Sequence, residues 1–233
     1  MRWLAFLALF VLTASAPPQQ DKVFLVTGFE RVRVDGPFIV EIVRGPSHAS
    51  AEGDARLLNR LNIHVDGATL VVGAGAEGWN LGRGEATGSP KITLTVPALR
   101  GLLVNGGGQV KVQDMRGARV DVALSGAGSI SVGTLTTDDL NLTLTGTGTI
   151  AAGGTARRAR IRSNGAGSID ASSLLVGDAT IVSETSGDMR LGVRYTVRVF
   201  ALGLGRVSIL GTPRCTISGP GPVECAGQIT RTR

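Results

Sequence analysis

Short stretches of alternating apolar and polar residues, each interrupted by a glycine-containing corner, run from residue 101 to the C-terminus of this chain. Around the corner that ends at Gly128, for example, apolar residues stand at Val122 and Leu124 before it and at Ile130 and Val132 after it. Alternation with a period of two is typical of a β-strand with one buried face. We therefore predict a strand on each side of every corner.

The corners recur seven times at nearly constant intervals, and their second glycines lie 20, 20, 19, 20, 18 and 16 residues apart. A repeat of about 20 residues is typical of a solenoid, in which each unit buries its apolar face only against its neighbours. Two or three short strands per repeat predict an all-β parallel β-helix (β-solenoid) of about seven turns. The structural corner glycines are Gly106, Gly108, Gly126, Gly128, Gly146, Gly148, Gly165, Gly167, Gly187, Gly203, Gly205, Gly219 and Gly221.

Equivalent positions of successive repeats predict columns of stacked side chains. The polar residues that precede the corner glycines should form one column, made of Asn105, Ser125, Thr145, Asn164 and Glu184. Nine residues before each second glycine, charges of opposite sign alternate in Arg119, Asp139, Arg158 and Asp178. Exposed pairs of this kind stabilise by only about 0–1 kcal/mol each, so we interpret the second column as a device for alignment and solubility.

The chain begins with the features of a secretory signal peptide. Arg2 precedes an apolar run that ends at Leu12, and Ala14-Ser15-Ala16 supplies the small residues of a cleavage site. We therefore expect an exported protein, in the periplasm, associated with the outer envelope or extracellular. No later apolar stretch is long enough to span a bilayer, so we expect no transmembrane segment in the mature chain.

The organisation that follows from these patterns has five parts: a signal peptide (1–16), a short linker (17–22), a β-rich N-terminal cap with the first turns of the domain (23–100), the glycine-cornered β-helix repeats (101–225) and a C-terminal tail (226–233).

The cap carries three local signals of its own. Asp54 is placed to cap a single helical turn, and Asp66-Gly67 is a two-residue hairpin signal. A glycine-rich stretch over residues 73–90, which contains Trp79, predicts one long loop. Loops of this length are functional or disordered.

Both cysteines, Cys215 and Cys225, fall at inward positions on either side of the last corner. In an exported protein two cysteines most simply form one disulfide, and closing so short a loop stabilises by about 2.5–3 kcal/mol in the chain-entropy model. Two buried free thiols are the alternative. Prolines at positions 213, 220 and 222 should blunt the strand edges of the last turn.

An ordered series of signals precedes the Ser-Gly-Ala-Gly repeats: Phe29, Gly36-Pro37-Phe38, Gly53-Asp54-Ala55, Leu57-Leu58, Asp66-Gly67 with Leu70, and Thr95-Val96-Pro97-Ala98-Leu99. Over residues 24 to about 225 this order resembles the auto-transporter adhesin head GIN domain family. The resemblance implies a right-handed parallel β-helix in an exported bacterial protein and brings no catalytic residues. The chain departs from the pattern at Thr185, which replaces a first glycine, and in its shortened last two turns.

The chain offers little material for catalysis or for a cofactor. His48 and His64, its two histidines, both fall in the cap. Ser125 lies in Ser-Gly-Ala-Gly and not in the Gly-x-Ser-x-Gly of a nucleophile elbow, and the glycine spacing does not match a dinucleotide site. Asp170 stands alone, whereas calcium-binding β-helices need an aspartate in every repeat. We expect no catalytic residues, no metal and no cofactor.

The net charge of +6 favours an anionic partner. Nucleic-acid binding normally adds aromatic platforms or a recognition helix, and the chain has one tyrosine and no such helix, so we expect no nucleic-acid partner. The sequence does not specify an oligomeric state.

A basic stripe occupies outward positions before the corners, with one aromatic residue beside it: Arg160, Arg162, Arg198, Arg214 and Phe200. An ordinary solvated face is one interpretation. The other is a binding site for an anionic glycan or envelope polymer, because arginine binds carboxylate and phosphate groups bidentately. On this second interpretation the protein is a secreted, non-enzymatic, adhesin-like domain.

The enzyme alternative is a polysaccharide lyase or hydrolase, since such enzymes also use β-helices. Their chemistry needs paired carboxylates, and these outward positions hold only Asp121.

Overall fold

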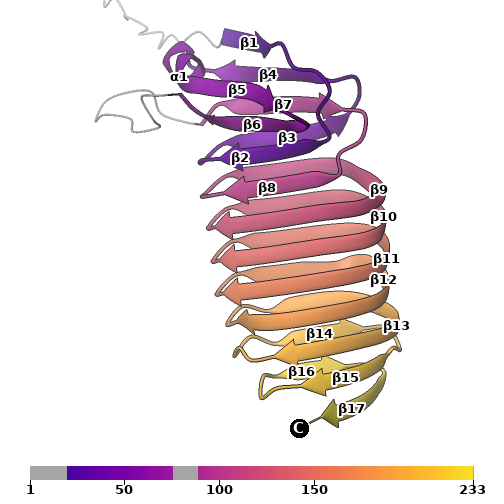
Figure 1. Cartoon of the computed structure of the whole chain (residues 1–233). Helices are drawn as coiled ribbons and strands as arrows, with labels where there is room; N and C mark the ends of the chain where they lie inside the picture. The colour runs from indigo at the N-terminus through magenta and orange to yellow at the C-terminus, as the bar shows by residue number, and fades with distance from the viewer. Residues whose placement is uncertain (1–19, 76–88, 233) are drawn as a thin grey trace, which may run out of the picture.

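The computed structural model describes residues 20–75 and 89–232, and over these residues the chain forms a parallel β-helix of about six turns (Figure 1). The predicted all-β solenoid is therefore confirmed. The expected signal peptide, Trp79 and most of the loop over residues 73–90 lie outside the described residues.

Strands of five to 18 residues build the body of the solenoid, and the longest of them, of 17 or 18 residues, each follow almost a whole turn. Each of them pairs in parallel with the strand of the next turn. Glycine corners separate successive strands, as the sequence predicts. The strands are β8 (Gly101–Asn105), β9 (Gln109–Gly126), β10 (Ser129–Gly146), β11 (Thr149–Gly165), β12 (Ser168–Thr185) and β13 (Met189–Ala201).

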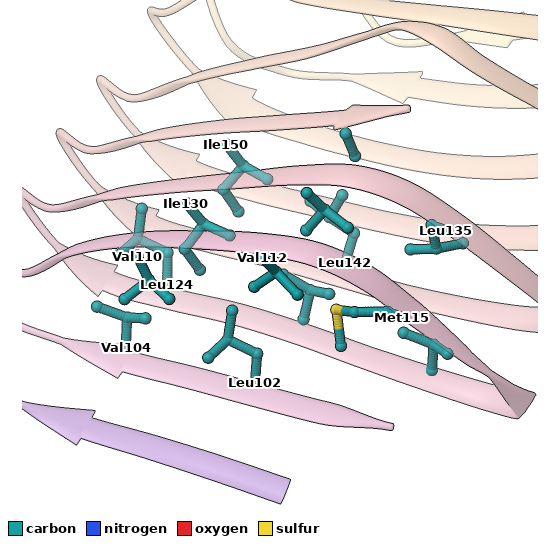
Figure 2. Packing of buried hydrophobic residues seen from close by; sticks show 14 of the residues in the cluster. Leu102, Val104, Val110, Val112, Met115, Leu124, Ile130, Leu135, Leu142 and Ile150 are labelled. Carbon is teal, nitrogen blue, oxygen red and sulfur yellow. The ribbon is translucent and has the colours of Figure 1, made fainter. Parts of the chain in front are cut away.

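Aliphatic side chains at equivalent inward positions stack into ladders that form the core. Ile130 pairs with Val110 on one side and with Ile150 on the other, and Leu144 pairs with Leu124. All five side chains are buried, and Figure 2 shows four of them, Val110, Leu124, Ile130 and Ile150, in the interior. Burying a side chain of this size stabilises by about 1.5–3 kcal/mol, so each turn depends on the turns next to it.

The N-terminal region continues the solenoid and then closes it. β2 and β3 stack in parallel on β8 and β9, and β6 and β7 stack in parallel on β2 and β3. β4 then pairs antiparallel with β7, β1 antiparallel with β4, and β5 antiparallel with β6. The elements are β1 (Gln20–Phe24), β2 (Arg31–Asp35), β3 (Ile39–Arg44), β4 (His48–Gly53), α1 (Ala55–Arg60), β5 (Leu61–Asp66), β6 (Thr69–Ala74) and β7 (Lys91–Val96).

Two of the three local signals in this region, the helix cap and the hairpin, act as predicted. The Asp54 carboxylate accepts a hydrogen bond from the backbone N–H of Arg56 at 2.8 Å and caps α1. Gly67 adopts a φ of 58° in the turn between β5 and β6. Such a turn favours glycine because it needs positive φ.

Four short strands form the last turns: β14 (Val207–Leu210), β15 (Arg214–Ser218), β16 (Val223–Cys225) and β17 (Gln228–Thr232). Cys215 and Cys225 form the predicted disulfide. Residues 228–232 of the expected tail pair in parallel with β15, and β1 begins within the expected linker, so the chain differs from the expected boundaries at both ends.

The predicted columns of the central turns are present. Asp139 pairs in register with Arg119 and Arg158, and Arg158 pairs with Asp178. The polar corner column runs in register from Asn105 to Glu184. Thr185 stands beside Gly165, at the position of the missing glycine.

Candidate ligand-binding face

The strand segments that precede the glycine corners form one continuous sheet, whose outward side we call the pre-corner face. Three outward columns cross it. The first contains the alternating charges and continues through Thr196 to Arg214. The second runs through Asp121, Asn141, Arg160, Thr180, Arg198 and Thr216. The third runs through Ala123, Thr143, Arg162, Val182, Phe200 and Ser218.

A shallow pocket of about 410 Å³ lies over the first two columns. Its lining includes the buried core residues Leu140, Ala159 and Ala179, and the charged and polar side chains of the two outward columns surround them. The surrounding side chains are those of Arg119, Asp139, Asn141, Arg158, Arg160, Asp178, Thr180, Thr196 and Arg198.

The carboxylates of this pocket are engaged by neighbouring turns. Arg158 binds Asp139 through two nitrogens, Nε at 2.8 Å from Oδ1 and a terminal nitrogen at 2.9 Å from Oδ2. The Thr196 hydroxyl donates a hydrogen bond to Asp178. Next to the pocket's polar rim, the Asn141 amide donates to Asp121 at 2.7 Å.

Two arginines of the pocket are available to a ligand. Arg160 and Arg198 are exposed, and neither makes an ion pair with any residue that the structure describes. Only β12 separates their strands, so the two positions lie about 10 Å apart at the usual spacing of neighbouring strands. The pocket can therefore present two guanidinium groups to an elongated anion.

The remaining residues of the predicted stripe lie beside the pocket and do not line it. Arg162 and Phe200 belong to the third column, separated by Val182, and the Phe200 side chain is 46% exposed. Counting back from the second corner glycine, Gly221, predicts Arg214 in the column of Arg198, but Arg214 pairs with Thr196 instead. The corner after β15 is two residues shorter than the corner after β13, so the count shifts the register by two residues.

Four pocket residues were recognised in the sequence only as an alignment column. Arg119, Asp139, Arg158 and Asp178 line the pocket together with the predicted Arg160 and Arg198. The alternation of charge is the sequence signal for them, but strand periodicity alone does not say which neighbouring columns line one pocket.

A second pocket, of about 680 Å³, lies over the middle segments of β9 to β13 and was not predicted. Tyr195, Leu175 and Arg194 are among the residues that line it. Tyr195 is 58% exposed, and the Arg194 guanidinium carbon lies 5.9 Å from its ring centre.

The two residues whose pKa values are shifted do not line either pocket. The pKa of Arg116 is raised by its hydrogen bond to Asp114, and the pKa of Asp170 is lowered by hydrogen bonds from Ser172.

Among residues 20–75 and 89–232, no group of three or more His, Cys, Asp or Glu side chains is placed to hold a metal ion. Within the same ranges, none of the helical structure has the length and apolar character of a membrane span.

Comparison with protein families gives one match over most of the chain. The model of the family described as "Putative auto-transporter adhesin, head GIN domain" matches residues 28–213. No match was found among curated proteins.

Several solved structures share the fold. A "putative adhesin" from Bacteroides fragilis NCTC 9343 superposes with a TM-score of 0.80 at 21% identity, over 93% of this chain and 98% of that one. A "putative adhesin" from Parabacteroides merdae ATCC 43184 gives 0.63 at 17% identity, over 92% and 96%. A "putative lipid binding protein" from Parabacteroides distasonis ATCC 8503 gives 0.56 at 17%, over 92% and 97%. At these identities the likeness shows the fold alone.

Proposed function

Because this chain belongs to the head GIN domain family, we propose that it is a non-enzymatic adhesin-like domain that binds an anionic polymer of the cell envelope or its surroundings through the pre-corner face. The family and the Cys215–Cys225 disulfide both indicate a protein that acts outside the cytoplasm. The expected signal peptide agrees with this location.

The observation that carries the proposal is the pair Arg160 and Arg198 in the pocket. Both are exposed and without an acidic partner among the described residues, whereas Arg158 is held by Asp139. Arginine binds carboxylate and phosphate groups bidentately. Arg162 and the exposed ring of Phe200 extend the same surface, so an acidic sugar chain could lie along it with contacts to several turns.

The test is binding of the mature protein to acidic glycans, first on an array and then by titration with a polyuronate and with a phosphate-containing envelope polymer. We expect the triple variant Arg160→Glu, Arg162→Glu, Arg198→Glu to lower affinity at least about a hundredfold, since each charge-assisted contact contributes about 1.5–3 kcal/mol.

A matched control changes the same total charge elsewhere. Lys111 and Arg190 belong to one outward column after the corners, and Arg116 pairs with Asp114. Reversing these three to glutamate should leave specific binding within a few-fold of the wild type. Equal loss in both variants would mean that net charge alone attracts the polymer, and unchanged binding in the first variant would exclude this face.

The same samples test the enzyme alternative, because Asp139 and Asp178 line the pocket and Asp121 lies beyond its edge in the second column. Incubation with uronate polymers should yield no unsaturated or reducing ends. Ends that appear with the wild type and disappear in Asp139→Asn or Asp178→Asn would replace the binding proposal with a lyase or hydrolase.

A further inference from the structure

The corners of the solenoid change from polar to apolar at its C-terminal end. The residue before the first corner glycine is polar in the upper turns, from Asn105 to Glu184, but it is Leu202 in the turn after β13. The middle residue of the same corner is Leu204, which is 87% exposed, and Leu202 is 46% exposed. The next corner continues this edge with Pro220 and Pro222, both exposed. We call these four residues the apolar corner.

The same end of the molecule carries the positive charge. Residues 101–188 contain seven Lys and Arg against eight Asp and Glu. Residues 189–232 contain six Arg against a single Glu, a difference of five. The excess of positive charge is therefore concentrated in the turns that also expose the apolar corner.

Not all of these arginines are neutralised by neighbours. Arg206 pairs with Glu224 at 3.1 Å. Arg214 and Arg231 are exposed and make no ion pair with another residue of the described ranges. Arg231 stands in register with buried Ile217, so it occupies an inward column of the last turn, where no further turn covers it in the described chain.

We propose that this end of the protein docks on an anionic lipid surface, with Leu202 and Leu204 inserted at the interface and Arg214 and Arg231 near the lipid phosphates. Peripheral binding needs two signals, buried apolar area and attraction to anionic headgroups, and this end supplies both. The site lies outside the pocket proposed for polymers, so the inference goes beyond that function and does not depend on it.

The experiment is flotation of the full mature chain with liposomes of phosphatidylcholine alone and with an added third of phosphatidylglycerol. We expect binding to the anionic liposomes that falls steeply with salt, and little to the neutral ones. The variant Leu202→Thr, Leu204→Thr gives this corner the residues of the upper corner at Thr145 and Thr147. It should lower affinity at least about tenfold, as expected for losing one or two buried leucines.

Two further variants separate the signals. Arg214→Gln with Arg231→Gln should remove most of the preference for anionic liposomes while leaving the leucines in place. In the Leu202→Thr, Leu204→Thr background, Thr145→Leu with Thr147→Leu should not restore binding, because that corner lies among turns without excess positive charge. The Arg160→Glu, Arg162→Glu pair should bind liposomes like the wild type, which distinguishes this surface from the polymer site.

Absence of binding to anionic liposomes, or equal binding after the leucine substitutions with the fold intact by circular dichroism, would overturn the proposal. It would also be overturned if the leucine substitutions abolished a dimer in solution without changing liposome flotation. That result would identify the apolar corner as a contact between copies of this chain.

Discussion

Single residues at the corners decide how closely neighbouring turns approach. A Cβ added at Gly146 would lie 2.5 Å from the carbonyl oxygen of Gly126, and Gly146 has a φ of 113°. Glycine tolerates both conditions because it has no side chain. Thr185 occupies the place of the first glycine in its corner. Its buried hydroxyl donates a hydrogen bond to the Gly167 carbonyl at 2.9 Å and accepts one from the Gly187 N–H at 3.0 Å.

We predict that Gly146→Ala lowers the free energy of unfolding by about 3 kcal/mol, the sum of left-handed strain and a backbone clash. The measurement is denaturant unfolding followed by far-ultraviolet circular dichroism. Gly107→Ala is the matched control, because its Cβ would meet nothing closer than 4.0 Å and its φ is not positive. Similar losses in the two variants would contradict the steric argument.

At the scale of the element, a strand segment is defined by its partners in the turns above and below. The register between β9 and β10 is constant along both strands, and the registers of β10 with β11 and of β11 with β12 each shift at one point only. The last turns consist of shorter strands, so less pairing holds them, and the disulfide ties β15 to β16 where the solenoid ends.

Replacing both Cys215 and Cys225 by alanine should therefore destabilise the C-terminal end selectively. A loop closed over a sequence separation of 10 contributes about 2.7 kcal/mol in the chain-entropy model. Hydrogen exchange should accelerate in β14 to β17 and stay unchanged in β9 to β12, and reduction of the wild type should reproduce the effect. Uniform acceleration along the chain would show instead that the whole solenoid unfolds as one unit.

At the scale of the molecule, stability is the sum of turns and of the contacts between adjacent turns. Removal of one whole turn should then be tolerated, whereas removal of half a turn should not. Residues 129–148 form one complete repeat, and β9 and β11 present equivalent columns to β10 on its two sides.

We predict that a chain lacking residues 129–148 folds to a β-rich structure with a lower unfolding temperature, because β9 can stack directly on β11. A chain lacking only residues 129–138 should fail to fold or aggregate, since its columns no longer align. Circular dichroism and size-exclusion chromatography compare the two. Failure of the whole-turn deletion to fold would mean that the central turns are not interchangeable.

What the sequence determined by itself is the architecture of the repeat. Strand alternation, glycine corners and the constant spacing predict which side chains point inward, and Leu124, Leu144, Ile130 and Ile150 stack as expected. These features are local or strictly periodic, so they can be recognised without knowing the rest of the fold. The disulfide could be predicted for a similar reason, since both cysteines flank one corner.

Only the tertiary structure decided how the columns combine. Arg214 lies in the column of Thr196 and not in that of Arg198, because the last corner is two residues shorter. The charged column and the column of Arg160 together line one pocket. The length of each turn and the salt bridges between turns set these positions. Both depend on contacts between residues about 20 positions apart, which alternation along a single strand does not contain.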